Sequence, residues 1–380
     1  MDRGFSMNDR GATLGCGPCC RARSPDLRCA MLTLSYAPYR LRFQSPFGTA
    51  HGMRDGTDAV FIRLEQMGVQ GYGECAMPPY VEEDQASVIR ALHHPELARA
   101  VRTGADALEA FLARPDVRLQ PAFRSGLHTA YIDLINKVKG TSVSSRSEVP
   151  EKALAMVTLG HGAVDDYADR VRQLEPGFPV LKIKLGTPYD REILNAVIQA
   201  DERPLLLDAN QGWRSLDEAL KVLEELDPQR VIGIEQPFAK ERWDLHQALT
   251  ERAEVLVIAD ESIQGLADLE RAPGVFGGVN LKLMKCGGLD QAAEMAGRAR
   301  ELGLKVMLGS MSESTLGCAT MLALAGLADL ADLDGPWLLS NDPFTGLGLE
   351  KGRFTVQGDE AGFGVKLRPG LPLTWTPIGA

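Results

Sequence analysis

The 380-residue chain has no run of apolar residues long enough to cross a lipid bilayer. It also shows no charged start followed by an apolar segment and a small-residue cleavage site. An excess of positive charge is missing too, because 41 lysine and arginine residues face 51 aspartate and glutamate residues. The net charge of −10 argues against nucleic acid or an anionic membrane as a partner. We therefore expect a cytoplasmic protein that binds a small molecule, with the question of a homo-oligomer left open.

Cysteine is scarce, and four of the seven cysteines lie in the first 30 residues: Cys16, Cys19, Cys20 and Cys29. No histidine is near them and their spacing matches no standard zinc site. Since this segment also lacks helical or strand periodicity, we interpret residues 1–30 as a disordered tail or an upstream extension. The other three cysteines lie in apolar surroundings and are predicted to be small core residues rather than nucleophiles: Cys75, Cys286 and Cys318.

Three strand-like segments come next, and they predict an antiparallel sheet. They cover residues 32–43, 57–66 and 69–76, with a glycine-rich loop over residues 48–56 between the first two. Helical periodicity then predicts helices over residues 84–94, 105–115 and 122–140. The first part of the chain, residues 31–150, is therefore predicted to be an α+β domain.

From about residue 153, short apolar strands alternate with amphipathic helices. The eight predicted strands are Ala153 to Gly160, Val180 to Gly186, Leu205 to Asn210, Val231 to Pro237, Val255 to Ser262, Gly278 to Lys285, Lys305 to Met311 and Leu330 to Asp334. They predict a TIM-like α/β barrel over residues 151–340 rather than an open doubly wound sheet, since no GxGxxG sequence follows the first strand. The glycine-rich segment 341–380 is expected to return to the first domain.

Polar residues stand near the C-terminal ends of these strands, where TIM barrels carry their chemistry. They are Lys182, Lys184, Asp208, Glu235, Asp260, Lys282, Asp332 and Asp334. Residues two apart on a strand point to the same side. In the strand over 278–285 the apolar residues Val279, Leu281 and Leu283 should face the helices. Lys282 then points into the barrel and Lys285 away from it, while the same alternation points Asp332 and Asp334 inward.

Three of these carboxylates end consecutive strands, about one βα unit apart. The spacings are 27 residues from Asp208 to Glu235 and 25 residues from Glu235 to Asp260. Three separate oxygen ligands with room for water and substrate are typical of a hard octahedral cation, most simply Mg²⁺. A helix cap or a lysine pair would explain any one carboxylate alone, but three at the same depth favour a metal site.

Two of the lysines are expected to face each other across this site. Strands four apart lie on opposite sides of an eight-stranded barrel, which places Lys184 opposite Lys282. A lysine can remove a proton α to a carboxylate only if its pKa falls towards neutral. We interpret Lys182, which points the same way as Lys184, as the like charge that lowers the pKa of Lys184. The alternative is that Lys182 and Lys184 only neutralise the carboxylates.

Together these residues resemble the enolase superfamily and, within it, the muconate-lactonizing-enzyme-like subgroup. The motifs that carry the resemblance are KIK (182–184), DANQGW (208–213), EQP (235–237), ADES (259–262) and KLMKCGG (282–288). The resemblance implies a modified (β/α)7β TIM barrel with an N-terminal α+β capping domain that the C-terminal segment completes. It also implies that Lys184 and Lys282 are the acid and base and that Asp208, Glu235 and Asp260 bind Mg²⁺, with Asn210 supporting them.

The sequence DLDGP at residues 332–336 is similar to a motif of the dipeptide epimerases, including the L-Ala-D/L-Glu epimerases. The resemblance gives Asp332 and Asp334 the role of holding the free α-amino group of a dipeptide. The physical need agrees, because a buried ammonium group requires carboxylate partners. The implied reaction inverts the α-carbon of the C-terminal residue of the dipeptide.

Substrate choice in this family is set largely by the capping loop, here residues 47–56 with His51, Arg54 and Asp55. Arg54 is a candidate for binding an acidic side chain of the dipeptide. Asp55 beside it could cancel its charge, and loop arginines are often solvated. The sequence therefore leaves open whether the dipeptide is acidic or apolar.

Three other functions stay open at this stage. An o-succinylbenzoate synthase or N-acylamino-acid racemase shares the lysines and metal ligands but gives the two strand-end aspartates no ammonium group to bind. A barrel that binds metabolites without turnover would not need the acid/base lysines. A Schiff-base aldolase uses a barrel lysine but not the three carboxylates.

Overall fold

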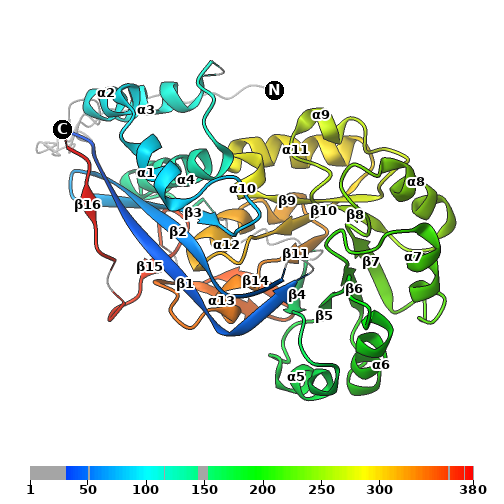
Figure 1. Cartoon of the computed structure of the whole chain (residues 1–380). Helices are drawn as coiled ribbons and strands as arrows, with labels where there is room; N and C mark the ends of the chain where they lie inside the picture. The colour runs from blue at the N-terminus through cyan, green and yellow to red at the C-terminus, as the bar shows by residue number, and fades with distance from the viewer. Residues whose placement is uncertain are drawn as a thin grey trace, which may run out of the picture.

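An antiparallel sheet and a closed parallel barrel organise the chain (Figure 1). The computed structural model describes residues 31–49, 52–114, 116–143, 153–357, 360–371 and 373–379. The predictions for residues 1–30, including their four cysteines, and for His51 lie outside these described residues. Within the described ranges, no helix is long and apolar enough to cross a membrane.

The antiparallel sheet has the strand order β16-β1-β2-β3. Its strands are β1 (Thr33–Thr49), β2 (Gly52–Gln66), β3 (Val69–Met77) and β16 (Thr376–Pro377). β1 and β2 are longer than predicted, because their pairing continues past an irregularity between Arg42 and Phe47 as far as Thr49 and Gly52. The segment predicted as a glycine-rich loop is therefore largely the far end of a long hairpin. This end reaches the barrel, where Gly48 pairs with His161.

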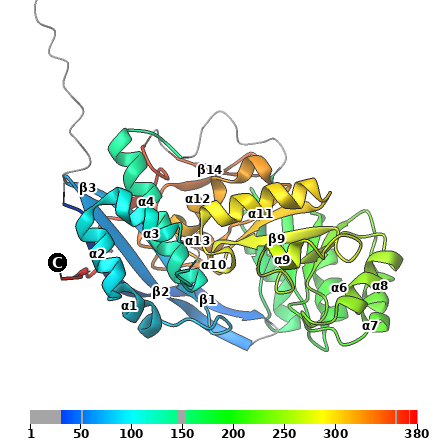
Figure 2. The same ribbon diagram turned by 90° about the horizontal axis from the view of Figure 1, so that it is seen from above.

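Four helices gather over this sheet, as Figure 2 shows from above: α1 (Gln85–Leu92), α2 (Pro95–Thr103), α3 (Ala105–Leu112) and α4 (Pro121–Lys139). Three of them were predicted, while α2 was not. α2 begins at Pro95, and the ring of His94 before it accepts a hydrogen bond from the Glu96 N–H. α4 packs directly on β3, because a Cβ at Gly73 would collide with the carbonyl oxygen of Gly126. Glycine at position 73 thus lets the two backbones touch.

Eight parallel strands close the barrel in the order β10-β11-β4-β5-β6-β7-β8-β9. They are β4 (Leu154–Leu159), β5 (Val180–Lys184), β6 (Leu205–Asp208), β7 (Val231–Glu235), β8 (Val257–Ala259), β9 (Gly278–Lys282), β10 (Lys305–Gly309) and β11 (Leu330–Asp332). All eight predicted strands are present, and each ends earlier than predicted. The chain leaves most of these strands at or next to a polar residue, so the polar side chains surround the mouth of the barrel.

Helices follow the first seven barrel strands: α5 (Tyr167–Gln173), α6 (Asp190–Ala200), α7 (Leu216–Leu223), α8 (Trp243–Arg252), α9 (Leu266–Leu269), α11 (Leu289–Glu301) and α12 (Thr315–Leu322). β11 is followed only by the four-residue helix α13 (Gly335–Leu338). The predicted fold class, a (β/α)7β barrel with a capping domain that the C-terminal segment completes, is therefore confirmed. The domain boundaries at residues 150 and 340 stay a prediction.

The remaining elements are short. They are the strands β12 (Phe344–Thr345), β13 (Leu347–Glu350), β14 (Arg353–Val356) and β15 (Lys366–Leu367), the helix α10 (Leu283–Cys286), and the 3₁₀ turns η1 (Val164–Asp166) and η2 (Ala325–Leu327). β12 pairs with β15 and β13 pairs with β14, each antiparallel. These two ribbons lie on the chain between the barrel and the last strand of the capping sheet.

Apolar side chains fill the lower part of the barrel interior: Met156, Val180, Leu206, Ile258 and Met307. Two residues further along the same strands, the side chains that point inward are polar, including Thr158, Lys182, Asp208 and Asp260. The polar layer therefore rests on an apolar floor. The cavity that this polar layer lines lies at the C-terminal mouth of the barrel.

The interface between the capping sheet and the barrel buries two carboxylates, Glu74 of β3 and Glu313 just before α12. Glu74 accepts hydrogen bonds from the backbone N–H groups of Ser314 (3.0 Å) and Gly317 (3.1 Å), and so caps α12 from across the interface. Burial, together with the charge of Glu313, raises the pKa of Glu74 to about 8. Burial raises the pKa of Glu313 to about 7. Near neutral pH the folded pair therefore holds protons that an unfolded chain would release.

The contribution of this pair to stability should consequently fall as the pH rises from about 5 to about 9. A carboxyl group whose folded pKa is raised stabilises the fold fully below its unfolded pKa, and this contribution is lost as the pH rises through the folded pKa. Glu74→Gln removes the titration of Glu74, so no charge is buried at this position at high pH. The midpoint of thermal unfolding at pH 9 should therefore rise by at least about 2 °C. Thermal unfolding measured at three pH values tests this, with Glu82→Gln on the exposed surface as the control. An unchanged pH dependence in Glu74→Gln would contradict the prediction.

Candidate active site

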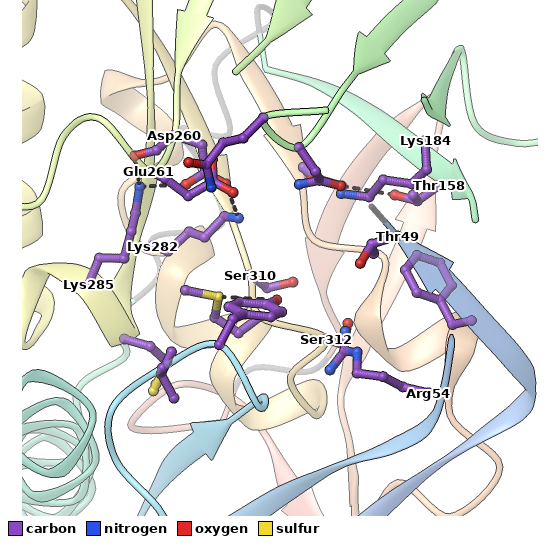
Figure 3. Close-up of a pocket in the computed structure, with 18 of the residues that line it drawn as sticks. Thr49, Arg54, Thr158, Lys184, Asp260, Glu261, Lys282, Lys285, Ser310 and Ser312 are labelled. Atoms are coloured by element: carbon purple, nitrogen blue, oxygen red, sulfur yellow. Dashed lines mark hydrogen bonds and ion pairs between the residues drawn. The ribbon is translucent and has the colours of Figure 1, made fainter. Parts of the chain in front are cut away.

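The candidate site lies at the C-terminal mouth of the barrel, in a cavity of about 530 Å³ (Figure 3). The β1–β2 hairpin closes one side of the cavity with Phe47, Thr49 and Arg54. Most of the predicted site residues line it: Arg54, Lys182, Lys184, Asn210, Asp260, Lys282, Asp332 and Asp334. Asp208 and Glu235 are fully buried and contact the lysines that line the cavity.

The three predicted metal ligands occupy neighbouring strand ends. Asp208 and Glu235 are directly paired across β6 and β7, and Asp260 immediately follows β8. One oxygen of each carboxylate is bonded to a protein N–H group. The Asn210 N–H donates to Asp208 Oδ1 (3.0 Å), Asn280 Nδ2 donates to Glu235 Oε1 (2.7 Å), and Lys285 Nζ donates to Asp260 Oδ1 (2.6 Å).

The second oxygen of each carboxylate contacts a lysine ammonium group. Lys184 Nζ donates to Asp208 Oδ2 (2.5 Å) and Lys282 Nζ donates to Asp260 Oδ2 (2.6 Å). Lys182 Nζ lies 2.7 Å from Glu235 Oε2, in a direction that makes an ion pair without a hydrogen bond. Each of these three oxygens therefore contacts the ammonium group of a lysine that lines the cavity.

The donor set fits a hard divalent cation. All three ligands are buried carboxylates, and the buried Asn210 Oδ1 beside them makes no hydrogen bond. Among the described residues, no three carboxylates already stand close enough together to hold a metal ion. The ammonium groups of Lys182 and Lys282 lie against the oxygens that a cation would bind. Oxygen ligands with space for water are the environment that Mg²⁺ prefers.

The pKa values of the three carboxylates are shifted in different directions. Burial alone would raise the pKa of Asp208, but Lys182 and Lys184 outweigh it and hold that pKa below its usual range. Lys282 and Lys285 lower the pKa of Asp260 in the same way, against its burial. Glu235 behaves differently, because burial and the charge of Asp208 raise its pKa to about 8.

Lys182 sits in the middle of the carboxylates. Its Nζ is 2.6 Å from Asp332 Oδ2, 2.7 Å from Glu235 Oε2 and 2.9 Å from Asp208 Oδ2. Burial would lower the pKa of Lys182, but these carboxylates raise it well above its ordinary value. Lys184 shares the Asp208 Oδ2 atom with Lys182, so the two ammonium groups are close neighbours.

Lys184 and Lys282 enter the cavity from β5 and β9, which are four strands apart in the closed barrel. Figure 3 places them on opposite sides of the cavity, with Lys282 beside Asp260 and Lys184 beside Thr158. Each is at most 8% exposed. The geometry therefore brings two protonatable nitrogen atoms to two faces of one enclosed space.

Asp332 and Asp334 lie together at the end of β11, next to β4. Asp332 accepts hydrogen bonds from Lys182 Nζ and from Thr158 Oγ1 (3.3 Å), and Asp334 accepts one from the Thr158 N–H (2.6 Å). Burial, then the charge of Asp332, raises the pKa of Asp334 to about 7. Two buried carboxylates that line the cavity, one of them paired with Lys182, form a site that attracts a further cation.

Arg54 reaches the cavity from the hairpin, between the rings of Phe43 (5.4 Å) and Tyr80 (5.5 Å). Its Nη1 donates to Thr57 Oγ1 (3.2 Å), and its buried Nε makes no hydrogen bond. Asp55, which the sequence offered as a charge partner for Arg54, pairs instead with Arg40 on the outer side of the hairpin. Neighbouring residues on a strand point to opposite faces, which explains the difference.

The prediction that Lys285 points away from the barrel interior is wrong. β9 ends at Lys282 and the next four residues form the helical turn α10, so strand alternation no longer applies. Residues three apart on a helical turn lie on the same side, which returns Lys285 to Asp260. Gly287 ends the turn with φ 86°, a left-handed conformation that favours glycine. The glycine pair in KLMKCGG was the sequence signal for this turn.

Comparison with known proteins gives a consistent result. Residues 166–371 match the family described as enolase C-terminal domain-like. The L-Ala-D/L-Glu epimerase of Bacteroides thetaiotaomicron is 33% identical over 88% of this chain and 88% of its own length. The hydrophobic dipeptide epimerase of Roseobacter litoralis is 31% identical over 88% of this chain and 98% of its own. The crystal structure of a dipeptide epimerase from Enterococcus faecalis, complexed with Mg and L-Leu-L-Tyr, has a TM-score of 0.78 and 25% identity over 88% of this chain and 98% of that chain.

Proposed function

This chain belongs to the enolase superfamily, and from that premise we propose that it is a Mg²⁺-dependent dipeptide epimerase that inverts the C-terminal α-carbon through two lysines. It is an isomerase of the racemase and epimerase class. The placement of Lys184 and Lys282 on opposite sides of one cavity is the observation that supports the mechanism most strongly. An α-carbon held between them can lose its proton to one lysine and regain a proton from the other.

The charges around the cavity suit this reaction. Mg²⁺ held by Asp208, Glu235 and Asp260 would stabilise the negative charge that develops on the substrate carboxylate when the α-proton leaves. Lys182 and Lys184 share the Asp208 Oδ2 atom, so their ammonium groups are close neighbours, and the tuning role of Lys182 stays a prediction. Asn210 holds Asp208 through its backbone N–H.

Asp332 and Asp334 support a free amine in the substrate. Two buried carboxylates at one edge of the cavity offer an ammonium group the partners that it needs when it leaves water. This observation favours a dipeptide over the N-succinyl substrates of the alternative, an o-succinylbenzoate synthase or N-acylamino-acid racemase. Those substrates would bring no positive charge to these aspartates.

Arg54 favours a dipeptide substrate whose C-terminal residue has an acidic side chain. Its contacts among the described residues are a neutral hydroxyl and two aromatic rings, so its charge is available to the cavity. A carboxylate can accept a charge-assisted hydrogen bond from it. His51, the other predicted residue of this loop, lies outside the described residues and stays a prediction.

Arg54→Met should therefore shift the preference for the C-terminal side chain. We expect kcat/KM for L-Ala-L-Glu to fall about 10- to 100-fold, the value of a hydrogen bond to a charged group. The value for L-Ala-L-Leu should stay within a few-fold of that of the wild type. Steady-state kinetics with both dipeptides measures this. Arg40→Met is the matched control, since Arg40 lies on the same hairpin but pairs with Asp55 and Asp58 on its outer side. Equal losses for both dipeptides in Arg54→Met would rule out the specificity role of Arg54.

The test of the proposed function is α-proton exchange in D₂O. The protein is incubated with Mg²⁺, a pooled library of L,L dipeptides and a set of N-succinyl amino acids, and mass spectrometry locates the deuterium. Deuterium at the C-terminal residue of a dipeptide, lost when EDTA removes the metal, is the expected result. Exchange confined to the N-succinyl compounds would transfer the assignment to the alternative enzyme. No exchange in either set, with metal bound, would favour a barrel that binds metabolites without turnover.

A further inference from the structure

Each proposed metal ligand has one oxygen that faces the ammonium group of a cavity-lining lysine, and a cation would have to take the place of that lysine to bind it. The other oxygen is occupied by a donor that belongs to the protein: the backbone of residue 210, the side-chain amide of Asn280 and the ammonium group of Lys285. These donors come from three different places in the barrel and act on three different carboxylates. The pattern is therefore a property of the whole site and not of one ligand.

Lys285 is held too firmly to swing away from Asp260. Its Nζ donates to Asp260 Oδ1 (2.6 Å), to the Asp260 carbonyl oxygen (2.7 Å) and to the Asn280 carbonyl oxygen (2.9 Å). These three acceptors use all three N–H bonds of the ammonium group. Lys282, three residues earlier, makes its contact with the opposite oxygen of the same carboxylate. Lys285 is thus a positioning residue and Lys282 faces the cavity.

Asn280 does for Glu235 what Lys285 does for Asp260. The Asn280 side chain points into the barrel from β9, is fully buried, and donates from Nδ2 to Glu235 Oε1 at 2.7 Å. The opposite oxygen, Oε2, faces Lys182. Asn280 and Lys285 make these contacts through nitrogen atoms, which donate hydrogen bonds. Each residue would therefore affect a bound cation through the carboxylate that it holds.

The number of free oxygens matters for the choice of ion. Mg²⁺ requires near-octahedral geometry and takes few protein oxygens, while Ca²⁺ accepts six to eight oxygens and often binds carboxylates through both. We propose that Asn280 and Lys285 make this site selective for Mg²⁺ over Ca²⁺ by restricting Glu235 and Asp260 to one oxygen each. The inference rests on the proposed function for the identity of the metal ligands. It needs no substrate to be tested.

The experiment is metal binding to the full-length, metal-free protein, measured by isothermal titration calorimetry with MgCl₂ and with CaCl₂. Lys285→Met and Asn280→Leu each replace the donor by an apolar side chain of similar size. Each substitution therefore frees one oxygen of the carboxylate that the donor held. In each variant we expect the ratio of the Kd for Ca²⁺ to the Kd for Mg²⁺ to fall about tenfold, the usual scale for removing a residue that holds a metal ligand. The ratio is used because the charge lost in Lys285→Met acts equally on two divalent ions.

Lys240→Met is the matched control. Lys240 is exposed and lines the same cavity, so its replacement removes one positive charge near the site without freeing a carboxylate oxygen. Its ratio should equal that of the wild type. Unchanged ratios in both Lys285→Met and Asn280→Leu overturn the inference, and thermal unfolding confirms that each variant is folded. If the wild type binds neither ion, the proposed function fails together with the inference; if the ions bind with the expected ratios but no dipeptide exchanges its α-proton, only the proposed function fails.

Discussion

Lys282→Ala is expected to abolish epimerisation, with a loss of about 10³-fold or more, at the upper end of the range for a positioned acid/base group. Exchange of the α-proton, in contrast to epimerisation, should be lost from one epimer only. Lys184 remains on its own side of the cavity, bonded to Asp208, and can still remove the α-proton from the epimer that presents it to that side. We therefore expect α-proton exchange in D₂O to continue from one epimer and to stop from the other.

The reciprocal variant, which removes the other lysine, tests the same mechanism. Lys184→Ala should stop exchange from the first epimer and preserve it in the second, because Lys282 approaches from β9 on the opposite side. NMR of each purified epimer in D₂O, with Mg²⁺ present, gives all four rates. If either variant exchanged both epimers at wild-type rates, the two-lysine mechanism would be wrong. Lys240→Ala, at the exposed edge of the cavity, should leave all rates close to those of the wild type.

Asp332→Asn is expected to lower kcat/KM for free dipeptides by about 100-fold or more, since removing one partner of a buried charge pair is strongly destabilising. Asp332 and Asp334 are buried together at the end of β11, so the ammonium group of a substrate would lose half of its negative partners. The change should appear mainly in KM if the aspartates bind the amine and do not take part in proton transfer.

A structural role for Asp332 would give a different result. Asp332 also bonds to Lys182, so its loss disturbs more than the substrate. Comparison with an N-acetylated dipeptide separates the two effects, because this substrate has no ammonium group. We expect Asp332→Asn to discriminate less between the free and the acetylated dipeptide than the wild type does. A loss of equal size for both substrates would assign Asp332 to structure alone, and Asp329→Asn, just before the opposite end of β11, provides the control.

The barrel could be predicted from the sequence because its signals are local. Short apolar strands with polar residues at their C-terminal ends alternate with amphipathic helices, and this pattern located all eight strands. The exact strand ends were predicted too far along the chain. The strands end at or next to polar residues such as Lys184, Asp208 and Lys282, and no pattern in a single strand shows how far its two neighbours extend.

The site was predictable to the extent that side chains follow strand alternation. Lys282 faces inward as its parity on β9 predicts, and Asn280, two residues earlier on the same strand, faces inward with it. Lys285 was misplaced because the strand becomes a helical turn at Leu283. The partner of Asp55 was also missed, since Arg40 lies on the neighbouring strand and only the pairing of β1 with β2 brings the two together. Contacts that depend on pairing between distant segments leave little trace in the order of residues.

The pairing of β16 with β1 has a consequence for how the protein is made. Ser35 and Tyr36 pair with Pro377 and Thr376, so this edge of β1 stays unpaired until β16, which follows the whole barrel in the chain, has been synthesised. Until then one edge of the capping sheet exposes unpaired backbone groups, which can recruit a strand from another chain. Because β1 and β2 also carry Phe47 and Arg54 to the cavity, the barrel of a nascent chain can be complete before the capping sheet that supports one wall of the active site.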